Sequence, residues 1–112
     1  MTVKSFEKNG VPTITPQDVA SLRGFELIDV RMPEEFTGEL GHVSGAKLKT
    51  LGPELEAFLN STAKDSKIVF ICRSGGRSGN ATMTALSLGF KEVYNMEGGM
   101  LLWNQSSLPV IR

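Results

Sequence analysis

Cysteine and histidine are almost absent from this chain of 112 residues, which contains one of each, Cys72 and His42. A single cysteine excludes a framework of intramolecular disulfides. One cysteine and one histidine cannot supply the four side chains of a structural zinc site. We therefore expect a domain held together by its core, with neither disulfides nor a structural zinc site. A chain without disulfides also suits a reducing compartment, which predicts a cytoplasmic location.

An excess of charge of either sign is also lacking. Twelve Lys and Arg residues balance twelve Asp and Glu residues, so the formal net charge is zero. No overall charge therefore draws the chain to nucleic acid or to an anionic membrane. The charge is uneven locally, because residues 66–91 carry four cations and no carboxylate: Lys67, Arg73, Arg77 and Lys91. Since long basic runs are absent, this excess indicates a small anionic ligand rather than a polymer.

Long hydrophobic runs are missing as well. The longest aliphatic or aromatic run near the cysteine is Ile68-Val69-Phe70-Ile71, which is far too short to span a bilayer. Residues 1–7 lack the apolar core of a signal peptide. With 40% hydrophobic and 21% charged residues, the composition is that of a soluble globular protein. The length predicts one compact domain over residues 1–112.

Short apolar runs alternate with helical patterns along the chain. Helices are predicted from Thr15 (as N-cap) to Arg23 and over 33–36, 53–59, 78–88 and 100–103. Strands are predicted over 27–30, 67–71 and 92–96. In the helix over 78–88, Ala81, Ala85 and Leu88 share one stripe. The strand over 67–71 is apolar on both faces, which is typical of a central strand in a parallel sheet. The pattern predicts an α/β domain with a mostly parallel sheet covered on both faces.

The informative segment is Cys72-Arg73-Ser74-Gly75-Gly76-Arg77-Ser78, which follows a buried strand and opens a helix. It therefore lies at the carboxyl end of the sheet, where open α/β folds bind ligands. The two glycines allow a tight curl with positive φ at both positions, and the curl can turn N–H groups inward as an anion-binding nest. The helix N-terminus and two arginines add positive charge. These features favour the thiolate, so we predict that Cys72 is a nucleophile.

The alternative for this cysteine is a small buried hydrophobe at the end of a strand. The six residues that follow Cys72 are Arg, Ser, Gly, Gly, Arg and Ser, which suit an inert core poorly. The nucleophile is the preferred interpretation.

Five segments, taken in order, resemble the rhodanese family of sulfurtransferases: 14–22, 27–36 with its Asp-Val-Arg, 41–46 as Gly-His-x-x-Gly-Ala, the loop 72–78, and 96–103 with its Gly-Gly and Trp. The resemblance implies a three-layer α/β/α domain with a central, mostly parallel sheet of about five strands. The chain departs from the family pattern in two places. The stretch from Phe36 to Gly41 is longer than usual, and Leu48-Lys49-Thr50 replaces the common Asn-Ile-Pro, which concerns the third strand and one rim of the pocket.

The resemblance also implies a reaction. Cys72 would take the outer sulfur of thiosulfate or a related small anionic donor as a persulfide, and cyanide or a thiol would accept it. The backbone N–H groups from Arg73 to Ser78 would stabilise the persulfide, and the reaction would require no metal or organic cofactor. We expect the Arg77 guanidinium to fold back over Cys72 toward the donor, while Arg73 points to the pocket rim or to solvent. The physiological donor and acceptor, and the oligomeric state, do not follow from the sequence.

Three other functions remain open. A cysteine-based phosphatase has a related loop with one residue more than the four that separate Cys72 from Arg77, and it needs an acid, for which Asp29 and Glu97 are candidates by type. A non-enzymatic binding module is disfavoured because the cysteine is present. A persulfide carrier that serves a protein thiol would use the same chemistry as the enzyme.

Three residues outside the loop are predicted to support it. A Cys–His protease would use His42 as a base, but a histidine in Gly-His-x-x-Gly-Ala is better explained as a turn residue that bonds to neighbouring backbone or a carboxylate. Asp29 and Arg31 are interpreted as structural partners beneath the site, joined by a charged hydrogen bond. Trp103 is assigned to the core.

Overall fold

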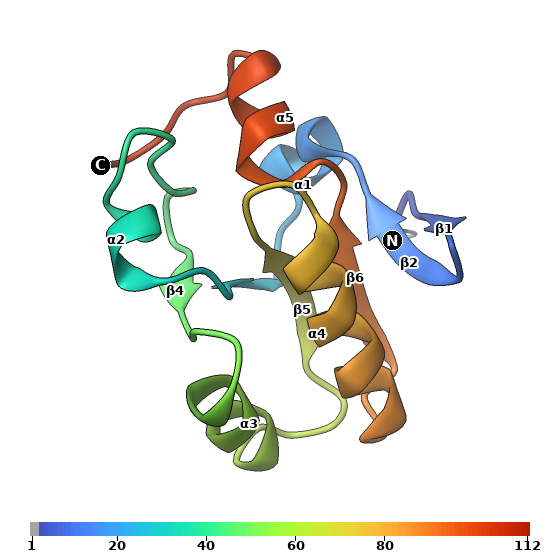
Figure 1. The fold of residues 1–112 in the computed structure, drawn as a ribbon. Coiled ribbons are helices and arrows are strands. Elements are labelled where there is room, and N and C mark those ends of the chain that lie inside the picture. Colours follow the sequence, from blue (N-terminus) through green and yellow to red (C-terminus); the bar gives the residue numbers. More distant parts are fainter. Residues whose placement is uncertain (1–2) are drawn as a thin grey trace.

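The computed structural model describes residues 3–112, and one six-stranded sheet runs through its centre in the order β1-β2-β6-β5-β3-β4 (Figure 1). Five strands are parallel, and β1 pairs with β2 in the antiparallel sense. The strands are β1 (Phe6–Lys8), β2 (Val11–Ile14), β3 (Glu26–Asp29), β4 (Lys47–Leu48), β5 (Lys67–Ile71) and β6 (Glu92–Met96). The helices are α1 (Pro16–Ser21), α2 (Pro33–Phe36), α3 (Pro53–Asn60), α4 (Gly76–Ser87) and α5 (Gly99–Gln105). The predicted fold class is confirmed.

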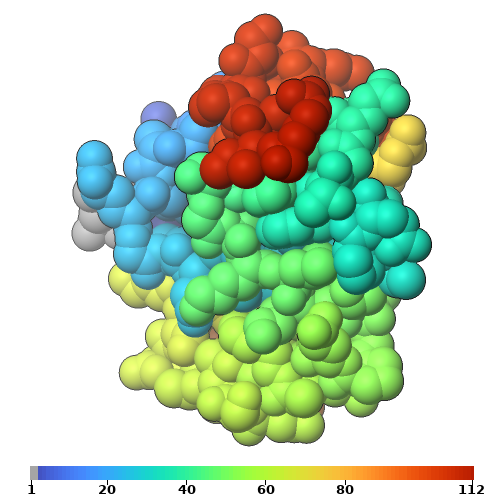
Figure 2. All heavy atoms as spheres, turned by 90° about the vertical axis from the view of Figure 1, so that its left-hand side faces the viewer, coloured from blue at the N-terminus to red at the C-terminus, as the bar shows by residue number. Residues whose placement is uncertain are grey.

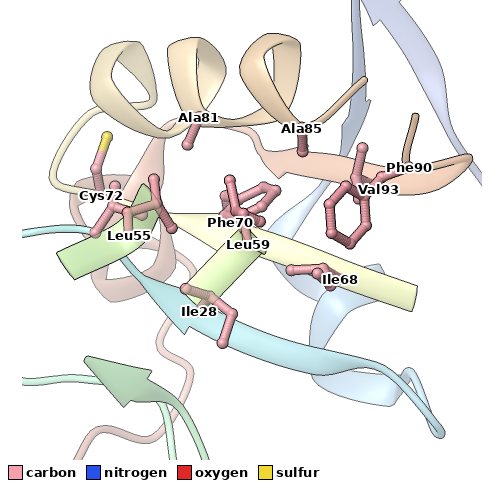
Figure 3. Packing of buried hydrophobic residues seen from close by; sticks show 11 residues of the cluster. Ile28, Leu55, Leu59, Ile68, Phe70, Cys72, Ala81, Ala85, Phe90 and Val93 are labelled. Carbon is pink, nitrogen blue, oxygen red and sulfur yellow. The ribbon is translucent and has the colours of Figure 1, made fainter. Parts of the chain in front are cut away.

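Two apolar clusters cover the two faces of the sheet. Because side chains alternate along a strand, β5 sends Ile68 and Phe70 into the cluster under α3 and α4, and sends Val69 and Ile71 into the other. Figure 3 shows the first cluster, with residues of α3 and α4 around Phe70. The second cluster contains Val19, Val43, Met100 and Trp103 among its buried residues, so Trp103 is a core residue as predicted. The strand over 67–71 is therefore central and buried on both faces.

Most helix boundaries agree with the sequence pattern. Thr15 caps α1, because its Oγ1 accepts a hydrogen bond of 3.3 Å from the Asp18 N–H. Helix α4 begins at Gly76, two residues before the predicted start, so Arg77 lies in its first turn. Leu88 is 41% exposed and does not join Ala81 and Ala85 in the core, because α4 has ended at this position and Leu88 is its C-cap. The predicted stripe was wrong at that residue.

The β1–β2 hairpin is an addition to the predicted elements. All three residues of β1 are exposed, so this strand has no buried face to reveal it in the sequence. The turn is Asn9-Gly10, with φ values of 52° and 81°. Asn-Gly is the strongest short signal for a two-residue hairpin, and it was available in the sequence.

The C-terminal segment packs against the loop that carries His42. The His42 N–H donates to the Ile111 carbonyl at 2.8 Å, and the Ile111 N–H donates back at 2.9 Å. Figure 2 shows the red C-terminal residues lying against this green and teal part of the chain. No helix within residues 3–112 is long and apolar enough to cross a membrane. The predicted absence of a signal-peptide core, and the predicted domain of 1–112, both include Met1 and Thr2, which lie outside the described residues.

Candidate active site

Cys72 follows β5 directly and is 1% exposed. Its Sγ accepts a hydrogen bond from the Gly75 N–H at 3.0 Å, and the Ser78 Oγ lies at hydrogen-bond distance from it, 3.2 Å. In Figure 3 the sulfur lies at the end of the apolar cluster nearest the first turn of α4 and points away from the labelled apolar side chains. The sulfur thus faces hydrogen-bond donors from the loop and from the start of α4. Such an environment favours the thiolate form of a cysteine.

The backbone of the loop turns sharply at a single glycine. Gly75 has φ +105° and is the N-cap of α4, whereas Gly76 has no positive φ. A positive φ was predicted as allowed at both glycines, and of the two only Gly75 has one. With this turn the Gly75 N–H points at the sulfur, and α4, which is 12 residues long, begins immediately after it.

The Gly98-Gly99 pair attaches the loop to α5. The N–H groups of Met100 and Leu101 donate to the carbonyls of Cys72 and Arg73, at 2.8 and 3.0 Å. A Cβ placed on Gly99 would collide with the Cys72 carbonyl oxygen and with the Arg73 backbone. The first turn of α5 therefore approaches the loop closely enough that only glycine fits.

Arg77 is bound to Glu35 of α2. Its Nη1 and Nη2 donate to Glu35 Oε1 and Oε2 at 2.7 and 2.8 Å. These hydrogen bonds lower the pKa of Glu35 to about 2 and raise the pKa of Arg77. From the sequence we expected the Arg77 guanidinium to lie over Cys72, and we assigned Glu35 no role in the site. In the structure the charge of Arg77 is already matched by a carboxylate.

The loop borders two clefts. One, of about 300 Å³, is lined by residues that include Ser74, Gly75, Gly76 and Asn95. The other, of about 260 Å³, lies toward α2, and its lining includes Glu34, Glu35, Glu39 and Arg73. Arg73 is exposed at the rim, and among residues 3–112 no carboxylate forms an ion pair with it. Arg73 is therefore the cation of the loop that is free to meet an anion.

Asp29 and Arg31 form a buried ion pair beneath the loop. Arg31 Nε and Nη2 donate to the two carboxylate oxygens of Asp29 at 2.9 and 2.8 Å, and both side chains are at most 1% exposed. Arg31 also donates to the carbonyls of Glu35 and Gly41, at 3.2 and 2.8 Å. The pair thus holds α2 and the segment before His42 in place.

His42 has a structural environment. Its Nδ1 lies 2.8 Å from the Phe36 carbonyl, which can only accept, so Nδ1 carries the proton. The ring also stacks on Phe36 with 3.7 Å between centroids. Within the described residues no hydrogen bond joins His42 to Cys72. The geometry matches a turn residue bonded to backbone.

Asn95 of β6 is a site residue that the sequence interpretation missed. Its Nδ2 donates to the Gly75 carbonyl at 3.1 Å, and its Oδ1 accepts a short hydrogen bond from Ser78 Oγ. Asn95 pairs with Phe70 across the parallel strands, so it lies at the same sheet edge as Cys72. A polar residue near the carboxyl end of a strand beside β5 was the signal that pointed to it.

Metal ligands do not gather around this site. Across residues 3–112, no group of three or more His, Cys, Asp or Glu side chains is placed to hold a metal ion. The described residues of the site place one free cysteine sulfur among hydrogen-bond donors.

Comparisons with known proteins agree with the order of motifs. The Synechocystis protein slr1261 is 36% identical over 103 residues, which are 89% of this chain and 56% of that protein. The thiosulfate sulfurtransferase GlpE of Pseudomonas aeruginosa is 32% identical over 92 residues, which are 80% of this chain and 81% of that enzyme. The crystal structure of a rhodanese-related protein from Thermoplasma volcanium superposes with a TM-score of 0.77 at 26% identity, and covers 88% of this chain and 96% of that one.

The family model of the rhodanese-like domain matches the sequence over residues 15–106, which include every strand from β3 to β6, the loop and α5. The chain spans a little over half the length of the Synechocystis relative and about four fifths of the Pseudomonas enzyme. Because the match includes both the sheet and the Cys72 loop, the chain belongs to the rhodanese family.

Proposed function

We propose that this protein is a sulfurtransferase that moves a sulfane sulfur through a persulfide on Cys72. The observation that carries the proposal is the sulfur of Cys72, buried at the start of α4, hydrogen-bonded by the Gly75 N–H and 3.2 Å from the Ser78 hydroxyl. A related enzyme with a similar length is named a thiosulfate sulfurtransferase, so thiosulfate is the donor we propose.

The reaction has two displacements at sulfur. The Cys72 thiolate attacks the outer sulfur of thiosulfate, the sulfur–sulfur bond of the donor breaks, and sulfite leaves with the electron pair. The product is a persulfide anion on Cys72. Cyanide or a thiolate then attacks the outer sulfur, and the Cys72 thiolate leaves. Donors at the start of α4 stabilise the anions that form on the sulfur atoms.

Arg73 is the residue we propose for receiving the donor anion. It is exposed on the rim and unpaired with any described carboxylate, whereas Arg77 is bound by Glu35. We assign Arg77 to holding the loop against α2, with Ser74, Gly75 and Gly76 presenting backbone to the bound sulfur. We assign Asp29, Arg31 and His42 a supporting role. They hold α2 and the segment that follows it in position.

A phosphatase fits this site poorly. A general acid must be protonated, but both oxygens of Asp29 are bound by Arg31, and the pKa of Glu35 is about 2. Glu97 is bound to Lys8 at 3.0 Å. We therefore rank sulfur transfer first. Transfer of the persulfide to a protein thiol uses the same residues and stays the alternative, and a cytoplasmic location stays a prediction.

Intact mass spectrometry tests the proposal directly. After incubation with thiosulfate the protein is expected to gain one sulfur atom, and cyanide is expected to remove it as thiocyanate. Cys72→Ala should show neither step while it keeps the fold, since one small residue replaces another. Phosphate release from an aryl phosphate, without sulfur loading, would reverse the ranking of the two enzymes. Loading that only a protein thiol can discharge would favour the carrier.

A further inference from the structure

The hydroxyl of Ser78 faces two acceptors at once. Its Oγ lies 3.2 Å from Cys72 Sγ and forms a short hydrogen bond with Asn95 Oδ1. A serine hydroxyl has one proton, so it donates to one of these atoms at a time. Ser78 is fully buried, and Asn95 is 8% exposed. The direction of this single proton therefore matters to both partners.

The orientation of the Asn95 amide is determined by Gly75. The Gly75 carbonyl can only accept, and the Asn95 nitrogen lies 3.1 Å from it, so this nitrogen must be the donor end of the amide. The oxygen of the amide then faces Ser78 and can only accept. Asn95 therefore competes with the sulfur for the Ser78 proton.

The outcome of this competition depends on the charge of the sulfur. When Cys72 is a thiol, its S–H donates to Ser78 Oγ, and Ser78 donates to Asn95, so every group is paired. When Cys72 is a thiolate, the sulfur draws the Ser78 proton and the buried Asn95 oxygen loses its donor, which is unfavourable. When Cys72 carries a persulfide, the charge moves to the outer sulfur, and Ser78 can donate to Asn95 again.

We propose that Asn95 is a positioning residue that withholds the Ser78 proton from Cys72 and so favours the states in which the inner sulfur is uncharged, the thiol and the persulfide. Asn95 would thereby restrain the free thiolate and help to retain the loaded sulfur. The proposal deepens the proposed function and rests on it only for the persulfide.

The charged groups around Cys72 come from every neighbouring element. They are Arg73 of the loop, Arg77 of α4 with Glu35 of α2, Asp29 with Arg31 at β3, and Glu97 with Lys8 of β1. Asn95 is neutral, and so is the alanine that replaces it. A change in Asn95→Ala is therefore not caused by a changed charge. Alanine also removes the hydrogen bond from Asn95 to the Gly75 carbonyl, and the Ser78→Ala background separates that loss from the loss of the acceptor.

The test follows the ultraviolet absorbance of the thiolate as a function of pH, with Cys72→Ala as the blank. Because the chain has one cysteine, the difference reports Cys72 alone. In Asn95→Ala the thiolate fraction at a pH on the acid side of the transition should rise by roughly three- to tenfold, the effect of one hydrogen bond. In Ser78→Ala the fraction should fall. Adding Asn95→Ala to Ser78→Ala should then change nothing.

Two further variants keep the test decisive. Asn80→Ala removes an exposed asparagine that lines the same cleft, and it should leave the profile unchanged. Asn95→Leu removes the acceptor toward Ser78, adds no charge and keeps a side chain of similar size, so it should raise the thiolate fraction as Asn95→Ala does. If Asn95→Ala does not fold, as judged by circular dichroism, Asn95→Leu carries the test.

The proposal is overturned if Asn95→Ala leaves the profile where it is or shifts it to higher pH. An equal shift in the Ser78→Ala background would also overturn it, because Asn95 would then act on sulfur without Ser78. If Asn95→Leu carries the test, a transition at unchanged or higher pH has the same meaning. No sulfur donor is present in these measurements. A result that overturns the role of Asn95 therefore leaves the proposed sulfur transfer untouched.

Discussion

Arg77 and Glu35 join the loop that carries Cys72 to helix α2 through two parallel hydrogen bonds of 2.7 and 2.8 Å. Helix α2 is held in turn by Arg31, which donates to the Glu35 carbonyl from its buried pair with Asp29. The position of the loop therefore depends on a chain of ionic contacts that begins inside the protein and ends at its surface.

The two arginines of the loop should differ in their effect on thiosulfate. Arg73→Ala is expected to raise the Michaelis constant for thiosulfate by about three- to tenfold, because an unpaired exposed cation is lost. Arg77→Ala is expected to raise it less, since Glu35 already matches that charge. Saturation curves with thiosulfate and with a neutral sulfur donor measure both effects.

Comparison of the neutral donor with thiosulfate separates a loss of anion binding from a change in the shape of the loop. Arg73→Ala should leave its curve unchanged, while Arg77→Ala should impair both donors to a similar degree by loosening the loop. Arg23→Ala, an exposed arginine that lines neither cleft beside the loop, serves as the control. A larger loss in Arg77→Ala that is confined to thiosulfate would return the donor-binding role to Arg77.

The Glu35–Arg77 pair should make stability depend on pH in the acid range. Glu35 has a pKa of about 2 in the folded protein, against 4.5 as its ordinary value, because Arg77 donates to its carboxylate. A lowered folded-state pKa adds stability that is complete above pH 4.5 and is lost as the pH falls toward about 2. Since both side chains are partly exposed, we expect at most about 1 kcal/mol.

Urea denaturation of the wild type and Glu35→Gln at several pH values checks this. The difference in the free energy of unfolding should be largest near neutral pH and should shrink below pH 4.5. Glu34→Gln, which removes an exposed neighbouring carboxylate without an ion pair among the described residues, should show no such trend. A difference that is constant with pH would argue against the ionic contribution.

The buried pair of Asp29 and Arg31 should be far more costly to break. Asp29→Ala leaves a buried guanidinium without its carboxylate, and we expect a loss of about 3–5 kcal/mol in the free energy of unfolding. Arg31→Met should cost a similar amount. The double variant should lose clearly less than the sum of the single losses, because no uncompensated charge remains. Additive losses in denaturant titrations would show that the two charges are not coupled.

Gly99→Ala should damage the site beyond its effect on backbone conformation. Gly99 has φ +57°, and a Cβ there would collide with the Cys72 carbonyl and the Arg73 backbone. Gly24 has φ +79° with open space around its Cβ position, so Gly24→Ala measures the conformational cost alone, about 1–2 kcal/mol. We expect Gly99→Ala to lose a further 1–3 kcal/mol or so.

Activity distinguishes the two glycine variants further. Gly24→Ala should load sulfur from thiosulfate at the wild-type rate at a temperature where it is folded. Gly99→Ala should load it more slowly, because the loop carbonyls must move away from α5. Equal stability losses and equal rates in the two variants would mean that the contact of α5 with the loop is unimportant.

Local features of the sequence were sufficient for most of the fold. Thr15-Pro16 marks the start of α1, and the apolar run 67–71 marks a central strand, because capping and strand burial depend on neighbouring residues. The loop of Cys72 was recognisable for the same reason, since its glycines and the helix that follows it are contiguous. Asn9-Gly10 carried a hairpin signal of the same local kind, although the exposed β1 gave it no support.

From its local patterns the sequence predicted five helices, three of the six strands, the loop of Cys72 and its place at the carboxyl end of the sheet. The binding of Arg77 to Glu35 and the contacts of Asn95 with Ser78 and Gly75 became apparent only in the folded structure. These partners are far apart in the chain, and a partly exposed ion pair or one polar residue on a strand leaves no periodic pattern. Which of several possible partners a side chain meets depends on the packing of whole helices against the sheet, and that packing is the sum of contacts distributed over the entire core.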